Sequence, residues 1–455
     1  MNFLKNLPCR GFLAIVVLSA VSCRSREPDY SIQFTDTRLK NGMRVILSED
    51  HSAPTYSLAV VYNAGARDEK AGRSGFAHLF EHMMFEGSEN VGKGEHFSLI
   101  ENNGGSTNGN TTSDRTLYYE TLPANQLDLG LFLEADRMRS LAITEANFRN
   151  QLETVKEERR ENYDNQPYGR TYEIMMETAY DNYAYKHIAI GSMADLNASN
   201  VDDARAFFKI YYAPNNAVLS LVGDFKSDDA LAKIRTYFED IPQQPPPPAP
   251  DMTEPPQTAE RRRTYEDPLA DLTEVDVLFK TPAGNTPEYY ALDVIATILG
   301  SGKSSRLYQK MVKEKQVAQE VSAYADERRG PGVFALGVTV RPDKDPKEIE
   351  RLLYEELERL KTEPVKDSEM DKVRMQVKRY MVDQQETTGD RARMLGMFAV
   401  FYDDPGLINS LTSKYAAVTP EQIQQVAREY FSEMNRTVVT TVPKAAARTA
   451  AGKAN

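Results

Sequence analysis

Five consecutive residues, His78-Leu79-Phe80-Glu81-His82, limit what this chain can fold into more than any other feature. The chain has five histidines in 455 residues, and these two stand four residues apart with a glutamate between them. Because residues i and i+4 of an α-helix project from the same face, both imidazoles can reach one cation. Glu81 would lie beside them, close enough to handle a water molecule bound to that cation. The H-x-x-E-H order reverses the zinc-binding H-E-x-x-H pattern.

A second interpretation of these residues is a buried helix whose histidines hydrogen-bond to backbone while Glu81 pairs with an arginine. Residues 76–85 are apolar nearly all round apart from the motif, which is typical of a buried helix. Ionisable groups in such a helix are costly to bury unless a metal or an ion partner satisfies them. The flanking residues therefore favour a metal site.

The length and the charge of the chain limit its class. At 455 residues it is too long for one hydrophobic core, which predicts two or more domains. Its net charge of −12 supplies no basic surface, so we expect no nucleic-acid partner. The only cysteines are Cys9 and Cys23. Any zinc in the mature chain must therefore be held by histidines and carboxylates.

Residues 1–22 predict a signal peptide. Lys5 and Arg10 precede an apolar run that is too short to span a membrane comfortably. Ala20-Val21-Ser22-Cys23 is typical of a bacterial lipoprotein cleavage site, although leucine is more usual at the position of Ala20. We therefore expect export to the periplasm and a lipid on Cys23 that anchors the chain to the bacterial outer membrane. Cleavage without lipid is the alternative.

A proline-rich stretch, residues 242–256, divides the rest of the chain. Such a stretch favours extended polyproline II and forms a semi-rigid spacer. The sequence predicts an N-terminal zinc-bearing domain over residues 30–240, a linker over 241–263 and a C-terminal domain over 264–445. These two domains are called the first half and the second half below.

The two halves read as copies of each other. Tyr211-Tyr212-Ala213-Pro214-Asn215-Asn216, followed by an apolar strand, has its counterpart 219 residues later in Tyr430-Phe431-Ser432-Glu433-Met434-Asn435. Ala64-Gly65 after one strand matches Ala283-Gly284 after another at the same spacing. This constant spacing implies an internal duplication with similar α+β folds.

The duplication also indicates which half carries the chemistry. At the same spacing His78 corresponds to Thr297, Glu81 to Gly300 and His82 to Ser301. We therefore expect the second half to lack the metal site and to form the opposing wall of a substrate chamber.

A third metal ligand is needed, because catalytic zinc sites usually have three protein ligands and an open fourth position. Residues 145–163 predict a helix dense in glutamate, with an apolar stripe of Phe148, Leu152 and Val155. At about 100° per residue, Glu153 and Glu157 point away from this stripe and Glu158 borders it. Glu158 is the best-placed ligand. The alternative is that all these glutamates are solvated.

These residues belong to a longer pattern. Gly75-Phe76-Ala77-His78-Leu79-Phe80-Glu81-His82 resembles the motif of the pitrilysin/insulinase peptidases, the inverted zincins that include mitochondrial processing peptidase. The resemblance extends over residues 62–69, 104–108, 116–119, 155–160, 165–168 and 299–308. It covers nearly all of the mature chain and is closest to the bacterial zinc-bearing subunit type.

The resemblance implies one zinc ion per chain, held by His78, His82 and Glu158, with Glu81 as the general base. It implies an α+β fold of two homologous domains, each an antiparallel sheet flanked by helices, forming a clam-like chamber. Peptide or unfolded protein substrates would add as a strand to a sheet edge. In this chain that edge lies near Gly105, Thr107 and Asn108.

The chain departs from the family at one place. Active members usually carry, in a second-half domain, an Arg and a Tyr seven residues apart that contact the substrate and the transition state. Without gaps these fall on Val312 and Gln319, while Arg306 and Tyr308 have the right types at other positions. The resemblance then implies a homologous partner subunit that supplies the Arg/Tyr pair. An alignment shifted by a few residues is the alternative.

The sequence thus predicts a zinc metalloendopeptidase that is the zinc-bearing subunit of a hetero-oligomer. Two alternatives remain, a non-catalytic peptide-binding or assembly subunit with a structural zinc and a lipoprotein that stores zinc. Of the other histidines, we expect His96 to be solvated in a loop, and His51 and His187 to be structural.

Overall fold

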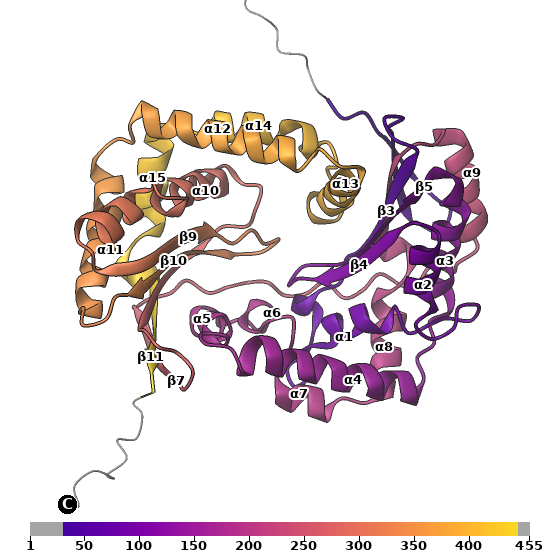
Figure 1. Ribbon diagram of the computed structural model, residues 1–455, viewed down its shortest axis with the longest axis horizontal. Coiled ribbons are helices and arrows are strands. Elements are labelled where there is room, and N and C mark those ends of the chain that lie inside the picture. Colours follow the sequence, from indigo (N-terminus) through magenta and orange to yellow (C-terminus); the bar gives the residue numbers. More distant parts are fainter. Residues whose placement is uncertain (1–30, 445–455) are drawn as a thin grey trace, which may run out of the picture. The chain divides into compact units, whose positions relative to one another are not determined.

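Two sheets, one in each half of the chain, organise the computed structural model, which describes residues 31–444 (Figure 1). The first sheet has the order β1-β2-β6-β3-β5-β4. Its strands are β1 (Thr35–Arg38), β2 (Arg44–Glu49), β3 (Thr55–Tyr62), β4 (Ser106–Thr111), β5 (Thr116–Pro123) and β6 (Ala217–Gly223). The second sheet has the order β7-β11-β8-β10-β9. Its strands are β7 (Arg261–Asp267), β8 (Glu274–Thr281), β9 (Ala318–Ala325), β10 (Gly332–Val340) and β11 (Arg436–Pro443).

The helices fill the intervals between these strands. The helices of the first half are α1 (Phe76–Met83), α2 (Glu95–Asn102), α3 (Leu127–Ser140), α4 (Glu145–Arg159), α5 (Thr171–Ala179), α6 (Tyr183–Lys186), α7 (Met193–Ala198), α8 (Val201–Tyr211) and α9 (Ser227–Phe238). Those of the second half are α10 (Pro287–Gly300), α11 (Pro346–Thr362), α12 (Asp367–Asp383), α13 (Thr388–Tyr402), α14 (Leu407–Ala416) and α15 (Pro420–Tyr430).

The α+β class with one sheet in each half is confirmed, with one correction to the sheets. Each contains a single parallel pair, β2 with β6 and β7 with β11, among otherwise antiparallel neighbours. Hydrophobic alternation predicts strands but does not fix the direction of the strand that pairs with them. The clam-like chamber stays a prediction.

The elements repeat at the spacing seen in the sequence. Strands β3 and β8 begin at residues 55 and 274, and β6 and β11 at 217 and 436, both 219 residues apart. The local hydrogen bonds repeat as well. The side-chain amide of Asn216 donates to the carbonyl of Tyr211 at 2.8 Å, and that of Asn435 donates to the carbonyl of Tyr430 at 2.8 Å. The duplication therefore includes these side-chain contacts.

Strand β3 is covered on both faces, which explains why it is apolar along its length. Val60 and Tyr62 point into the core made with the helices of the first half. On the other face α13, from the second half, packs against β3 and β6. The Thr388 and Ser57 hydroxyls are 2.8 Å apart, and Gly396 leaves room for Val61.

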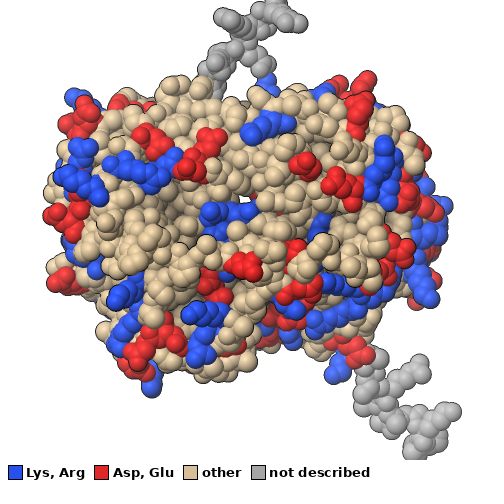
Figure 2. Space-filling model, turned by 180° about the vertical axis from the view of Figure 1, so that it is seen from behind, with Lys and Arg blue, Asp and Glu red and all other residues tan. Residues whose placement is uncertain are grey.

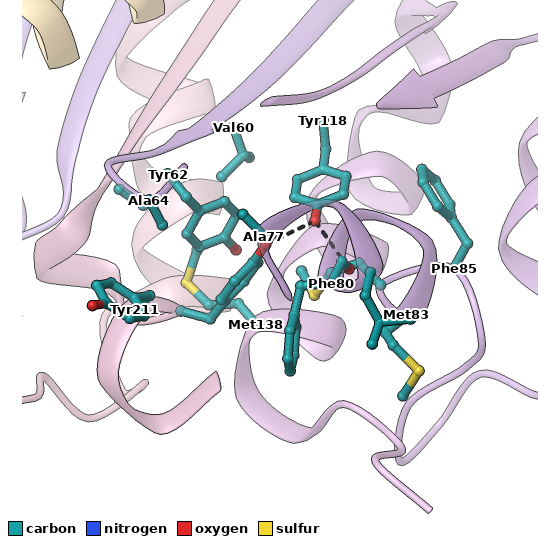
Figure 3. Close-up of a cluster of buried hydrophobic side chains, with 14 of the residues drawn as sticks. Val60, Tyr62, Ala64, Ala77, Phe80, Met83, Phe85, Tyr118, Met138 and Tyr211 are labelled. Carbon is teal, nitrogen blue, oxygen red and sulfur yellow. Dashed lines mark hydrogen bonds between the residues drawn. The ribbon is translucent and has the colours of Figure 1, made fainter. Parts of the chain in front are cut away.

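The core of the first half lies directly behind the motif helix. Tyr118 on β5 contributes a fully buried hydroxyl that bonds to the carbonyl of Phe80 at 3.3 Å and to the hydroxyl of Tyr212 at 3.1 Å (Figure 3). These bonds fix the motif helix against the sheet.

The proline-rich segment is tied to the fold rather than suspended as a spacer. Asn215 and Gln244 exchange two hydrogen bonds of 2.8 and 3.0 Å. The carboxylate of Glu254 accepts from the backbone of Asp181 and Asn182 and pairs with Lys280 of β8. The last residues of the expected linker, 261–263, already belong to β7.

The described part of the chain contains no helix that is long and apolar enough to cross a membrane. Residues 1–22 and Cys23 lie outside the described residues, so the expectations of a signal peptide and a lipid remain predictions. On the face shown in Figure 2, basic and acidic side chains are interspersed over the surface.

Candidate metal centre

The motif helix α1 starts at a glycine that only a glycine can be. Gly75 has φ of 93°, and a Cβ there would come within 2.9 Å of the carbonyl oxygen of Ile190. The carboxylate of Glu69 then accepts hydrogen bonds from the backbone of Gly75 at 2.9 Å and of Ala77 at 2.8 Å. An anion at this end of the helix satisfies free N–H groups and is favoured by the helix dipole.

The helix places the histidines on its less buried face. Ala77, Leu79 and Phe80 are fully buried, whereas the motif's polar side chains remain partly accessible. The rings of His78 and His82 lie 4.8 Å apart, centre to centre. Their Nε2 atoms are 3.7 and 3.3 Å from one oxygen, Oε2 of Glu158. Two helices, α1 and α4, therefore bring three candidate ligand atoms together.

Glu158 is the glutamate of α4 that reaches the imidazoles. The side chains of Glu153 and Glu157 are 67% and 57% exposed and pair with Lys156 and Arg160 on the same helix. Phe148, Leu152 and Val155 are buried, as the stripe predicted. The helical-face argument thus separates Glu158 from its neighbours.

The electrostatics of the three groups favour two largely uncharged donors and one carboxylate. Burial lowers the pKa of His78 to about 4, against the attraction of Glu158. Burial also opposes protonation of His82, but its hydrogen bond to Glu158 outweighs this and raises its pKa. That hydrogen bond in turn lowers the pKa of Glu158.

These residues fit a zinc ion. Two imidazole nitrogens and one carboxylate oxygen are a ligand set that catalytic zinc sites use, leaving a fourth position open. The three atoms all lie within 4.8 Å of one another, so small rotations bring them around one ion. Nδ1 of His78 is buried without a hydrogen-bond partner among the described residues.

Glu81 points toward strand β4 rather than toward Glu158. Its Oε2 accepts a hydrogen bond of 2.7 Å from the hydroxyl of Thr111, while burial raises its pKa. Gly109 leaves the space that Glu81 needs, since a Cβ there would be 3.0 Å from Cγ of Glu81. Both residues were missed as site residues, although their two-residue spacing on one strand places them on one face.

The residues predicted to bind substrate lie on or beside β4, at an edge of the first sheet. Gly105 and Asn108 are exposed, and the hydroxyl of Thr107 donates to the carbonyl of Tyr119 at 3.2 Å. Within this strand it is Gly109 and Thr111 that adjoin Glu81.

The expectation for His96 was wrong. It lies on α2 with only 3% of its surface exposed, and it packs edge-on against Phe85. Glycines at 92 and 94 suggested a loop, but Gly94 begins a helix whose inner face is buried. His51 is exposed and bonds Asp224 at 2.6 Å, while His187 bonds Glu69 at 2.9 Å.

The second half carries none of this site. The positions equivalent to the motif, Thr297, Gly300 and Ser301, lie at the end of α10. Arg306 is bonded to both carboxylate oxygens of Glu369, at 2.7 and 2.8 Å. It is therefore already committed to a contact within its own half.

The comparisons with known proteins agree with this geometry. The sequence model described as "Insulinase (Peptidase family M16)" matches residues 44–192, and that described as "Peptidase M16 inactive domain" matches residues 199–377. The chain is 29% identical to the zinc protease PqqE of Helicobacter pylori, over 95% of this chain and 98% of that protein. It is 24% identical to a probable mitochondrial-processing peptidase subunit beta of Arabidopsis thaliana, over 87% and 75%. The crystal structure of a protease from Helicobacter pylori is similar with a TM-score of 0.86 at 28% identity, covering 90% of this chain and 100% of that one.

Proposed function

The chain belongs to the pitrilysin/insulinase peptidase family (family M16), and we propose that it is a zinc-dependent endopeptidase acting on peptides or unfolded polypeptide segments. One observation carries this proposal. Two imidazoles on α1 and the Glu158 carboxylate on α4 converge, with a separate carboxylate, Glu81, beside them. A site that only stored metal would have no need for Glu81.

The residues divide the work between binding and proton transfer. His78, His82 and Glu158 would hold the ion. When bound by three such ligands, zinc lowers the pKa of a water molecule toward about 7 and polarises a carbonyl group.

Glu81 takes the proton of the attacking water and passes it to the departing amine. Thr111 occupies Oε2 of Glu81, which leaves Oε1 for the proton. The raised pKa that burial gives this carboxyl brings it closer to the working pH of a general base.

The edge of the first sheet supports an extended substrate. β4 pairs with β5 on one side only, so its other side is open to strand addition among the described residues. A peptide lying along Gly105, Thr107 and Asn108 would continue past Gly109 and Thr111, next to Glu81.

A homologous partner subunit is part of the proposal. The positions expected to carry the Arg/Tyr pair hold Val312 and Gln319, and Arg306 is engaged by Glu369. The similarity to a protein named as a peptidase subunit agrees with this idea. We also propose export and a lipid on Cys23, on the sequence pattern alone.

The test combines metal analysis with cleavage. The purified chain, alone and mixed with a candidate homologous partner, is incubated with an unstructured peptide, with and without a zinc chelator. The proposal expects slow cleavage by the chain alone, faster cleavage with the partner, loss on chelation and recovery with added zinc. Bound zinc without cleavage in either mixture would favour the binding-subunit alternative, and cleavage by metal-free protein would refute the proposal.

A further inference from the structure

A second group of metal-binding side chains lies in the interior of the first half. His96 on α2, Glu120 on β5 and Glu134 on α3 have exposed fractions of 3%, 0% and 1%. One ligand atom from each lies within 4.8 Å of the others. Three separate elements of the fold therefore converge on one buried point.

The group is incompletely satisfied by the protein. Nε2 of His96 and both carboxylate oxygens of Glu120 are buried without a hydrogen-bond partner among the described residues. The shortest distance between the two side chains is 3.9 Å, which is too long for a hydrogen bond. Buried polar atoms without partners are rare in native proteins, and an ion or a water molecule absent from the coordinates is a usual explanation.

The charges of the group are also unbalanced. Arg137 bonds both oxygens of Glu134 and is held over the rings of Phe85 and Tyr118, at 5.0 and 4.5 Å from their centres. This single cation faces two carboxylates. The charge of Glu120 is left without compensation, and burial raises its pKa well above the ordinary value.

The fold makes room for the unpartnered carboxylate. Gly130 on α3 lies against Oε1 of Glu120 and the hydroxyl of Tyr56, and a Cβ at this position would collide with both. The Tyr56 hydroxyl donates its proton to the carbonyl of Gln126 at 3.0 Å, so it does not satisfy Glu120. The glycine keeps α3 close to β5 without displacing the Glu120 carboxylate.

We propose that His96, Glu120 and Glu134 hold a second divalent transition-metal ion, which is structural and independent of the ion at His78. One imidazole nitrogen and two carboxylates suit zinc, iron(II) or manganese. Glu134 can bind an ion while paired with Arg137, because each carboxylate oxygen has two lone pairs. The ion would join α2, α3 and β5, the strand that supports the β4 edge.

The burial of the two sites distinguishes them. His78, His82 and Glu158 are partly accessible, so a chelator can remove their ion from the folded chain. An ion at Glu120 is released only when the chain opens. We therefore expect elemental analysis of the purified full chain to find about two metal equivalents, and one after dialysis against EDTA, with the folded state verified by circular dichroism.

Variants then assign the retained equivalent. Glu158→Gln should lose the EDTA-accessible equivalent and keep the other, whereas Glu120→Gln should lose only the resistant one. Glu101→Gln, on the exposed side of α2, is the matched control and should keep both. If Glu120→Gln does not fold, X-ray absorption at the metal edge of the Glu158→Gln chain should give nitrogen and oxygen ligands at about 2.0–2.2 Å.

The result that overturns the proposal is equally direct. A folded Glu158→Gln chain with no bound metal would show that Glu120 is neutralised by a proton or a water molecule instead. Retention of the resistant equivalent in folded Glu120→Gln would also refute it. Neither result depends on peptidase activity, so the proposed function and this inference can fail separately.

Discussion

The hydroxyl of Thr111 donates a 2.7 Å hydrogen bond to Oε2 of Glu81, which joins the edge strand of the first sheet to the motif helix. The contact fixes the direction of the carboxylate that we assign as the general base. A hydrogen bond to a charged group contributes about 1.5–3 kcal/mol. Thr111→Val should therefore reduce kcat by about 10- to 100-fold, with metal content unchanged.

The conservative variant tests whether Thr111 acts through its hydroxyl. Thr111→Ser keeps the donor and should restore most of kcat, while KM stays near the wild-type value in both variants. Steady-state kinetics on an unstructured peptide separate the two constants. Equal losses in the valine and serine variants would mean that the methyl group, and not the hydrogen bond, matters.

Glu81→Gln removes the base and keeps the shape of the side chain. We expect full zinc content and a fall in kcat of at least about 10²-fold, the usual contribution of general acid–base catalysis. Elemental analysis and peptide cleavage on the same sample check both expectations. Wild-type turnover in this variant would contradict the assignment of Glu81.

Glu158→Gln should weaken zinc at the candidate centre instead. Loss of residues that merely support a metal ligand costs about 10- to 100-fold in affinity, so loss of a ligand should cost more. Competition with a zinc-binding dye measures the affinity. Glu157→Gln is the matched control because its side chain is 57% exposed and pairs with Arg160; a similar loss in both variants would argue against Glu158 as a ligand.

Gly75→Ala should destabilise the start of the motif helix. A side chain at positive φ costs about 1–2 kcal/mol, and here it also approaches the Ile190 carbonyl oxygen at 2.9 Å. Gly94→Ala is a precise control, because Gly94 has φ of 72° but no atom within 4 Å of the added Cβ. Denaturant unfolding should give a larger loss for Gly75→Ala, and equal losses would exclude the steric contribution.

His187 should make stability depend on pH. Its two ring nitrogens face acceptors, the Tyr183 carbonyl and the Glu69 carboxylate, both at 2.9 Å, so both nitrogens are satisfied only in the protonated ring. Burial opposes the charge, but the bond to Glu69 outweighs it and raises the pKa above 6.5.

The sign of this effect follows from linkage. Because the folded pKa is the higher one, the stabilisation is complete below pH 6.5 and is lost as pH rises through the folded pKa. The stability difference between wild type and His187→Gln should therefore shrink from pH 5.5 to pH 9, about one unit below and a few above that value. A constant difference across thermal unfolding curves in this range would show that His187 is not protonated.

The position of Glu158 could be predicted because it depends on local geometry. A helix of regular pitch fixes which of Glu153, Glu157 and Glu158 faces inward, and the internal repeat fixed the boundaries of β3 and β8 in the same way. Both are properties of short stretches of sequence or of their spacing.

His96 and the parallel strand pairs could not be predicted on these grounds. Whether His96 is solvated depends on Phe85 and on β5, which the sequence separates from it. The pairing of β2 with β6 joins residues more than 160 positions apart. The contact of Thr111 with Glu81 likewise arises only when β4 packs on α1.

The packing of α13 on β3 has a consequence for how the duplicated chain can be divided. Each repeat has its own sheet, but the outer face of the first one is sealed by a helix encoded more than 300 residues downstream. A fragment ending in the proline-rich segment would leave Ala59 and Val61 wetted. The two repeats therefore behave as one cooperative body, and a lesion in α13 can disable chemistry that it never touches.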